Sequence, residues 1–187
     1  MDTPTQDSLH PQNTNSPTAT TDAPGTLNGL IRVWADGSCD PKMGCGGWAF
    51  IAQRIVNDEV SGNGDVKTGI EPHGATSNRM AMQAAIEALK HIPRNDAAPI
   101  TVYSDSQIII DGMTKNAEVW KANGWKKSDG KPVLNLDLWK QILSAATGRN
   151  VTWEMVKGHA GNAQNKRAKA LAQDALRRAR AASFAAE

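Results

Sequence analysis

Two short apolar runs, each ending at an aspartate, set the strongest constraint on the fold of this chain. Residues 31–36 alternate Ile, Val and Ala with Arg and Trp before Asp36, and residues 99–105 end at Asp105 in a similar way. Both patterns are typical of β-strands. A helix is predicted between them, and a helical crossover joins parallel neighbouring strands, so we expect the two aspartates to meet at the strand ends. A single aspartate such as Asp36 could simply cap a turn, but two aspartates that lie close together favour a metal or ligand site.

The remaining periodicity predicts a mixed α/β domain. Three further strands are expected at residues 48–56, 60–70 and 151–156, the second of them broken by glycines. Helices are expected at residues 79–90, 106–113, 135–146 and 164–182. The first three strands follow one another through short links, which favours an antiparallel meander.

Composition divides the chain into a leader, one domain and a short tail. Residues 1–28 are polar and have almost no large apolar side chains, so we expect them to be disordered. Residues 29–182 are long enough for one domain with its own core, and residues 183–187 would form a C-terminal tail. The net charge is only +2, but no Lys or Arg precedes Arg32. The folded part is therefore more basic than the total indicates, which permits an acidic partner such as nucleic acid.

The sequence carries none of the patterns of an exported or membrane-bound protein. No apolar run approaches the roughly 20 residues that span a bilayer. The two cysteines, Cys39 and Cys45, have no metal-type spacing, and no secretion signal is evident. We expect a cytoplasmic, monomeric protein that does not engage a membrane.

Residues 115–131 combine two tryptophans with five lysines. Ammonium groups bind phosphates, and indole rings offer flat faces to sugars or bases. The candidate nucleic-acid contacts here are Trp120, Lys121, Trp125, Lys126 and Lys127. Alternatively, both tryptophans are core residues flanked by solvated lysines, because Trp is usually largely buried.

The C-terminal part adds one histidine and a basic helix. His159 lies between glycines in the segment 157–161 and could shuttle protons, although a structural role is the alternative. Arg177, Arg178 and Arg180 suit the C-terminal end of a helix.

Together these motifs resemble the ribonuclease HI family, whose members cut the RNA strand of RNA–DNA hybrids. The resemblance spans about residues 30–176 and rests on residues 36–39, 78–80, 104–107, 120–131, 135–139 and 153–161. It implies a ribonuclease H-like α/β fold, a five-stranded mixed sheet flanked by helices. It also implies that Thr76, Asn78 and Gln107 touch the minor groove or the phosphates of a bound nucleic acid.

The family holds two Mg²⁺ ions with four carboxylates, and this chain matches only half of them. Asp36 matches the first carboxylate and Asp105 the third. Ala81 stands where the family has a Glu after Asn-Arg-Met, and Lys169 stands where it has an Asp in the last helix. We therefore expect binding of Mg²⁺ or Mn²⁺ at Asp36 and Asp105 to be weak or absent, with the Lys169 ammonium replacing part of the missing positive charge.

Neighbouring acidic residues are not expected to replace the missing carboxylates. At about 100° per residue, Glu87 lies roughly 240° round its helix from Ala81, and Asp174 lies roughly 140° round from Lys169. Neither direction leads to the site.

Three functions follow from this pattern. The first is a ribonuclease HI-like protein that binds RNA–DNA hybrid or structured RNA, with catalysis lost or severely impaired. The second is an active endonuclease that uses one metal ion at Asp36 and Asp105 with His159 as shuttle. The third is a protein-binding scaffold. Metal dependence separates the first two, and the salt dependence of hybrid affinity separates both from the third.

Overall fold

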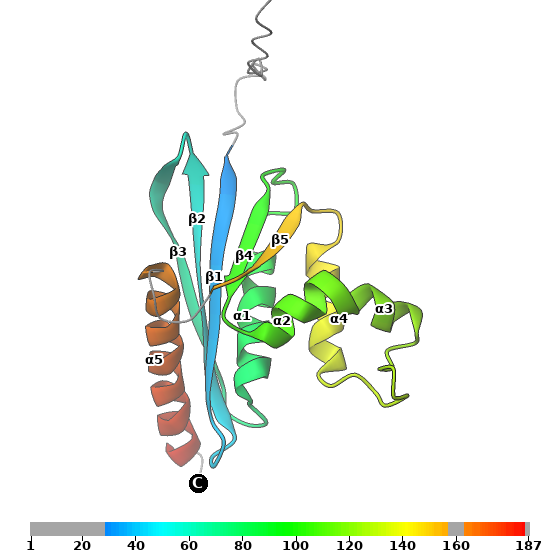
Figure 1. Cartoon of the computed structure of the whole chain (residues 1–187). Coiled ribbons are helices and arrows are strands. Elements are labelled where there is room, and N and C mark those ends of the chain that lie inside the picture. The colour runs from blue at the N-terminus through cyan, green and yellow to red at the C-terminus, as the bar shows by residue number, and fades with distance from the viewer. Residues whose placement is uncertain (1–28, 157–162, 186–187) are drawn as a thin grey trace, which may run out of the picture.

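The computed structural model describes residues 29–156 and 163–185, and its strands form one mixed sheet (Figure 1). The strand order is β3-β2-β1-β4-β5. The strands are β1 (Leu30–Asp40), β2 (Cys45–Val56), β3 (Glu59–Glu71), β4 (Ile100–Ser104) and β5 (Val151–Met155). The predicted leader and His159 lie outside the described residues.

The pairing confirms the predicted topology. β1, β2 and β3 form an antiparallel meander, β4 runs parallel to β1, and β5 runs parallel to β4. The predicted break in β3 is wrong, because this strand is continuous. Gly62 and Gly64 adopt positive φ angles of 75° and 68°, and the register shifts opposite them between Ala52 and Arg54. Glycine adopts this conformation without strain, so the strand bends at a bulge instead of ending.

Within residues 29–156 and 163–185, five helical segments and one π-helical turn surround the sheet. They are α1 (Ser77–His91), α2 (Gln107–Asp111), the π-helix η1 (Gly112–Asn116), α3 (Ala117–Ala122), α4 (Leu136–Ala146) and α5 (Ala163–Ala185). The short helix predicted at 106–113 therefore continues through η1 into α3. Gly112 permits this arrangement, since a Cβ there would lie 2.0 Å from a ring carbon of Trp139 on α4.

The sheet separates two apolar layers. On one face, α1 and α4 pack on β1 and β4 in a cluster that includes Val33, Ile86 and Trp139. On the other face lies α5, where Ala168 packs on Trp34 and Ile51 (Figure 1). In this helix Ala172, Ala175 and Leu176 are buried and Leu171 is half-buried. Among the described helices, none is long and apolar enough to cross a bilayer.

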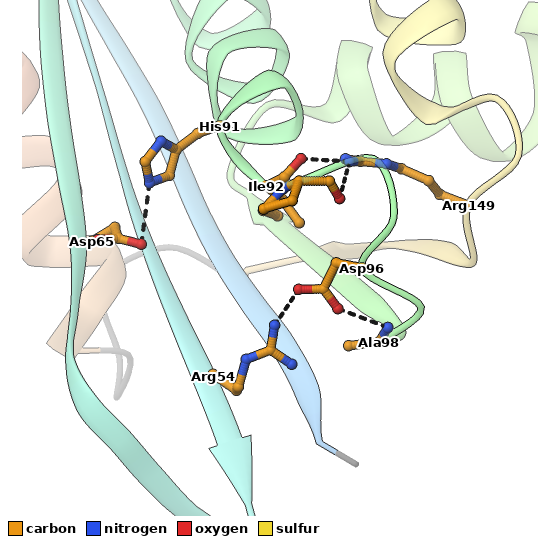
Figure 2. A network of polar contacts seen from close by, with 8 residues as sticks. Arg54, Asp65, His91, Ile92, Asp96, Ala98 and Arg149 are labelled. Carbon is orange, nitrogen blue, oxygen red and sulfur yellow. Dashed lines mark hydrogen bonds and ion pairs between the residues drawn. The ribbon is translucent and has the colours of Figure 1, made fainter. Parts of the chain in front are cut away.

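A polar network fixes the C-terminal end of α1, at the opposite end of this helix from the site described below (Figure 2). Arg149 donates hydrogen bonds to the carbonyls of Leu89, Ile92 and Pro93, which are left without helical donors at the end of α1. His91 Nε2 lies 3.1 Å from Asp65 Oδ2 on β3. These contacts tie α1 to both the β5 side and the β3 edge of the sheet, and so set the position of its other end.

Candidate functional site

The two aspartates meet where β1 and β4 diverge. Asp36 is not at the end of its strand as predicted, because β1 stays paired with β2 as far as Asp40. However, Trp34 and Tyr103 are the last residues that pair between β1 and β4, so Asp36 lies just beyond the paired part of these two strands. Asp105 directly follows β4, as predicted. Both aspartates line a pocket of about 370 Å³, together with Asn78 and Ala81 of α1 and the start of α2.

Asp36 is a buried carboxylate with little compensation. Asp36 is only 4% exposed to solvent. One oxygen, Oδ1, accepts a hydrogen bond of 2.7 Å from the Gly37 amide, and within the described part of the chain Oδ2 is buried without a partner. Burial, and next the charge of Asp105, raise the pKa of Asp36 from 3.8 to about 6, against the lowering effects of the Gly37 amide and Lys169.

A cation on α5 reaches the second aspartate. The ammonium of Lys169 lies 3.9 Å from Asp105 Oδ2, and the two side chains are 44% and 31% exposed. Such a half-exposed pair contributes little to stability, about 0–1 kcal/mol. Its importance is electrostatic: it places a fixed positive charge beside the pair of carboxylates.

Helix α1 approaches β1 closely at Gly37. A Cβ at Gly37 would lie 2.2 Å from the Ala81 backbone nitrogen and 2.4 Å from Met80 atoms, so glycine is needed for this contact. Ala81 is 4% exposed and still lines the pocket. The first turns of α1 therefore form one wall of the pocket, with Ala81 facing the aspartates.

The N-terminal end of α1 is held by two sets of contacts, one of which the sequence analysis missed. Thr76 caps the helix, since its Oγ1 accepts a hydrogen bond of 3.2 Å from the Arg79 amide. Arg79 also donates to both carboxylate oxygens of Asp137 on α4, at 3.0 and 2.7 Å, and to Asn135 at 3.3 Å. Arg79 and Asp137 belong to two of the motifs that resemble the family, but no sequence pattern shows that these motifs touch across 58 residues.

The tryptophans of the 115–131 segment point inward. Trp120 packs edge-on against Trp139, with ring centroids 5.3 Å apart, and Trp120 and Trp125 both pack against the core cluster. Lys121, Lys126 and Lys127 are exposed. This arrangement agrees with the alternative in which the tryptophans have a packing role, while the lysines are left to face a partner.

Comparison with known proteins identifies the family. The sequence model of RNase H matches residues 29–177. This chain belongs to the RNase H family. The ribonuclease H of Paramagnetospirillum magneticum is 41% identical over 147 residues, which cover 78% of this chain and 89% of that protein. The ribonuclease H of Roseobacter denitrificans is 42% identical over 141 residues, covering 75% and 91%.

Solved structures support the same fold. The crystal structure of LC9-RNase H1, described as a type 1 RNase H with the type 2 active-site motif, is 34% identical with a TM-score of 0.66, covering 83% of this chain and 74% of that one. A foamy viral protease–reverse transcriptase in complex with RNA/DNA hybrid has a TM-score of 0.64 at 16% identity, covering 91% and 24%. The second likeness concerns the fold only.

In this RNase H family member, the pocket unites most of the residues predicted for the cleft. Asp36, Asn78, Ala81, Asp105 and Gln107 all line it. Two others lie next to these residues: Thr76 caps α1, and Lys169 approaches Asp105. The predicted shuttle, His159, is outside the described residues.

The acidic neighbours of Ala81 and Lys169 point elsewhere, as the helical spacing predicts. Glu87 accepts hydrogen bonds from Gln83 and Lys90, and Asp174 forms an ion pair with Arg177. Among the described residues, no group of three or more His, Cys, Asp or Glu side chains is placed to hold a metal ion.

Proposed function

We propose that this RNase H family member binds RNA–DNA hybrid or structured RNA in the pocket between β1, β4, α1 and α2, and that its cleavage activity is lost or severely impaired. The observation that carries the proposal is the pair formed by Lys169 and Asp105, at a pocket that Asp105 and Ala81 both line. Two of the four positions that hold carboxylates in the resembled family offer no metal ligand here. In this proposal, Asp36 and Asp105 are a remnant of the catalytic set.

The donors in the pocket do not fit two Mg²⁺ ions. When bound, such ions activate a water molecule and stabilise the leaving oxygen of a phosphodiester. Mg²⁺ loses its water shell reluctantly and depends on anionic oxygen ligands. This pocket offers two carboxylates, with an ammonium 3.9 Å from one of them. Burial, and next the charge of Asp105, raise the pKa of Asp36 to about 6, and Lys169 offsets only part of that rise.

Binding is favoured by the same substitutions. Relative to the family pattern, Ala81 removes one negative charge, and Lys169 replaces a negative charge with a positive one. Both changes make the pocket more attractive to phosphates. Asn78 and Gln107 add amide groups to the pocket lining, and the exposed lysines of the 115–131 segment offer further cations.

The test is cleavage of a labelled RNA–DNA hybrid in Mg²⁺ and in Mn²⁺. We expect no cutting by the parent and recovered cutting by the double variant Ala81→Glu/Lys169→Asp. Asp36→Asn in that double variant is the matched control and should abolish the recovered activity. Binding is measured separately by fluorescence anisotropy, in EDTA, so that affinity is read without turnover.

An active endonuclease is the second candidate, because the relatives that match most of this chain are named ribonuclease H. It would hold one ion at Asp36 and Asp105, with His159 as the shuttle. Metal-dependent cutting by the parent that Asp36→Asn abolishes would establish this candidate and contradict our proposal.

A further inference from the structure

Helix α5 has two flanks, and its contacts identify the one that faces the pocket. Lys169 reaches Asp105 after β4, and Arg180 Nε donates to Asp40 at the end of β1 at 2.9 Å. Arg178 points the other way, since its guanidinium donates to Thr68 of β3 at 2.7 Å. Figure 1 shows β3 at one edge of the sheet and β4 on the other side of β1. The flank that carries Lys169 and Arg180 is thus the pocket side of the helix.

Four cations share this flank. At about 100° per residue, Arg180 lies roughly 20° round the axis from Lys169, Lys166 roughly 60° and Arg177 roughly 80°, all in the same direction. Gln173 falls between them at roughly 40°. We call these residues the pocket-side row: Lys166, Lys169, Gln173, Arg177 and Arg180. By contrast, Arg167 and Arg178 lie roughly 160° and 180° away from Lys169.

The outer members of the row are accessible to a ligand. Lys166 is exposed, and the Arg177 side chain is 66% exposed even though it pairs with Asp174. Lys169 and Arg180 are 44% and 45% exposed beside their aspartates. The fold therefore uses two of these cations partly to hold α5 against the sheet, while Lys166 and Arg177 project further from it.

We propose that the pocket-side row of α5 is a second phosphate-binding surface, which continues from the pocket and contacts the backbone of the same duplex. The row runs from Lys166 to Arg180, and the 14 steps between these residues correspond to about 21 Å at 1.5 Å per residue. That length matches about six nucleotides of one strand at 3.4 Å each. The 115–131 segment lies on the other side of β1 from this surface, since Figure 1 shows α5 and α3 on opposite sides of that strand.

This inference rests on the proposed function, since it takes the ligand of the pocket to be a nucleic-acid duplex. The chemistry of the row fits such a ligand. Guanidinium and ammonium groups bind phosphate oxygens without reading sequence, and each phosphate neutralised adds about 0.9 to the slope of log affinity against log salt. The row should therefore increase affinity and salt dependence without changing sequence preference.

The experiment compares two double variants of equal charge in the full chain. Lys166→Gln/Arg177→Gln removes two cations from the pocket-side row, and Arg167→Gln/Arg178→Gln removes two from the far flank. Anisotropy titrations use a hybrid of about 24 base pairs, roughly 80 Å long, at several salt concentrations in EDTA. Thermal melting of each variant verifies that it is folded, which we expect because these side chains lie on the solvent side of α5.

We expect the magnitude of the slope of log affinity against log salt to be smaller by about two in the pocket-side variant than in the parent, while the far-flank variant keeps the parental slope. Equal losses in both variants would overturn the inference, because net charge alone would then account for binding. Unchanged slopes in both would also overturn it and leave the proposed function standing. If the parent itself fails to bind hybrid, the proposed function fails, and this inference fails with it.

Discussion

Single residues decide the electrostatics of this pocket, and Asp36 is the most sensitive of them. Its carboxylate is buried with one oxygen unpartnered among the described residues, so the folded protein holds the proton more tightly than the unfolded chain does. For such a group, stability is highest below the unfolded pKa of 3.8 and is lost as pH rises towards about 6.

The first prediction concerns the pH dependence of stability. At 1.36 kcal/mol per pKa unit, the rise from 3.8 to about 6 corresponds to roughly 3 kcal/mol lost by neutral pH. Asp36→Asn should remove this loss and raise the free energy of unfolding at pH 7 by roughly 1–3 kcal/mol. Urea unfolding from pH 4 to pH 8, in EDTA, measures the effect. Parallel stability curves for parent and variant would contradict the prediction.

Gly37 gives the second prediction at this scale. An added methyl group would meet backbone atoms of Met80 and Ala81 at 2.2 to 2.4 Å, so α1 would have to move. Because backbone cannot yield as a side chain can, Gly37→Ala should cost about 1–3 kcal/mol of stability. Chemical denaturation measures the cost, with Ser38→Ala, the next residue of β1, as the control. A loss of the same size in the control would assign the effect to the strand and not to the contact with α1.

At the scale of elements, the 115–131 segment, which includes α3, separates packing from binding. Its tryptophans pack on the core cluster while three of its lysines face solvent. The sequence suggested that both residue types contact nucleic acid. In the structure the tryptophans lie against the core, whereas these lysines lie at the surface.

This division gives the third prediction. Trp120→Ala should lower the stability by about 2–4 kcal/mol, because it removes a ring packed on Trp139. Lys126→Gln/Lys127→Gln should leave stability within about 0.5 kcal/mol and weaken hybrid binding instead. Thermal melting and anisotropy, run on both variants, measure the two effects. A stable Trp120→Ala protein with weakened binding would show that the indole contacts the ligand directly.

At the scale of the whole molecule, the pocket depends on four separate parts of the chain. β1 and the residue after β4 supply the two aspartates, α1 supplies Ala81, and α5 supplies Lys169 from the other face of the sheet. Changing Ala81 and Lys169 together should therefore convert the pocket without changing the fold, because Ala81 lines the pocket and the half-exposed pair of Lys169 and Asp105 contributes only about 0–1 kcal/mol to stability.

The fourth prediction uses metal binding as the readout. A ligand that binds only the folded state stabilises it by about 2.7 kcal/mol at 100 times its Kd. Added Mg²⁺ should leave the melting temperature of the parent unchanged and raise that of Ala81→Glu/Lys169→Asp. Ca²⁺-free buffer and a matched ionic strength in NaCl control for general salt effects. An equal rise in the parent would mean that two carboxylates suffice to hold the ion.

By itself the sequence determined the order of the strands and helices and the proximity of Asp36 to Asp105. Alternation in residues 31–35 and helical spacing in residues 79–90 are local patterns, and the crossover rule then makes β1 and β4 parallel neighbours. The family motifs added Ala81 and Lys169 to the same region, although they lie 88 residues apart in the chain.

Only the tertiary structure decided the surroundings of these residues. Contacts between segments distant in the sequence determine where β1 ends and why the π-helical turn forms at Gly112. They also determine the paired hydrogen bonds from Arg79 to Asp137. The burial of Asp36 and the direction of each α5 flank depend on how the layers pack. Local periodicity shows which face of an element is apolar, but the partner of that face, and hence the charge of the pocket, is set by the packing of the whole chain.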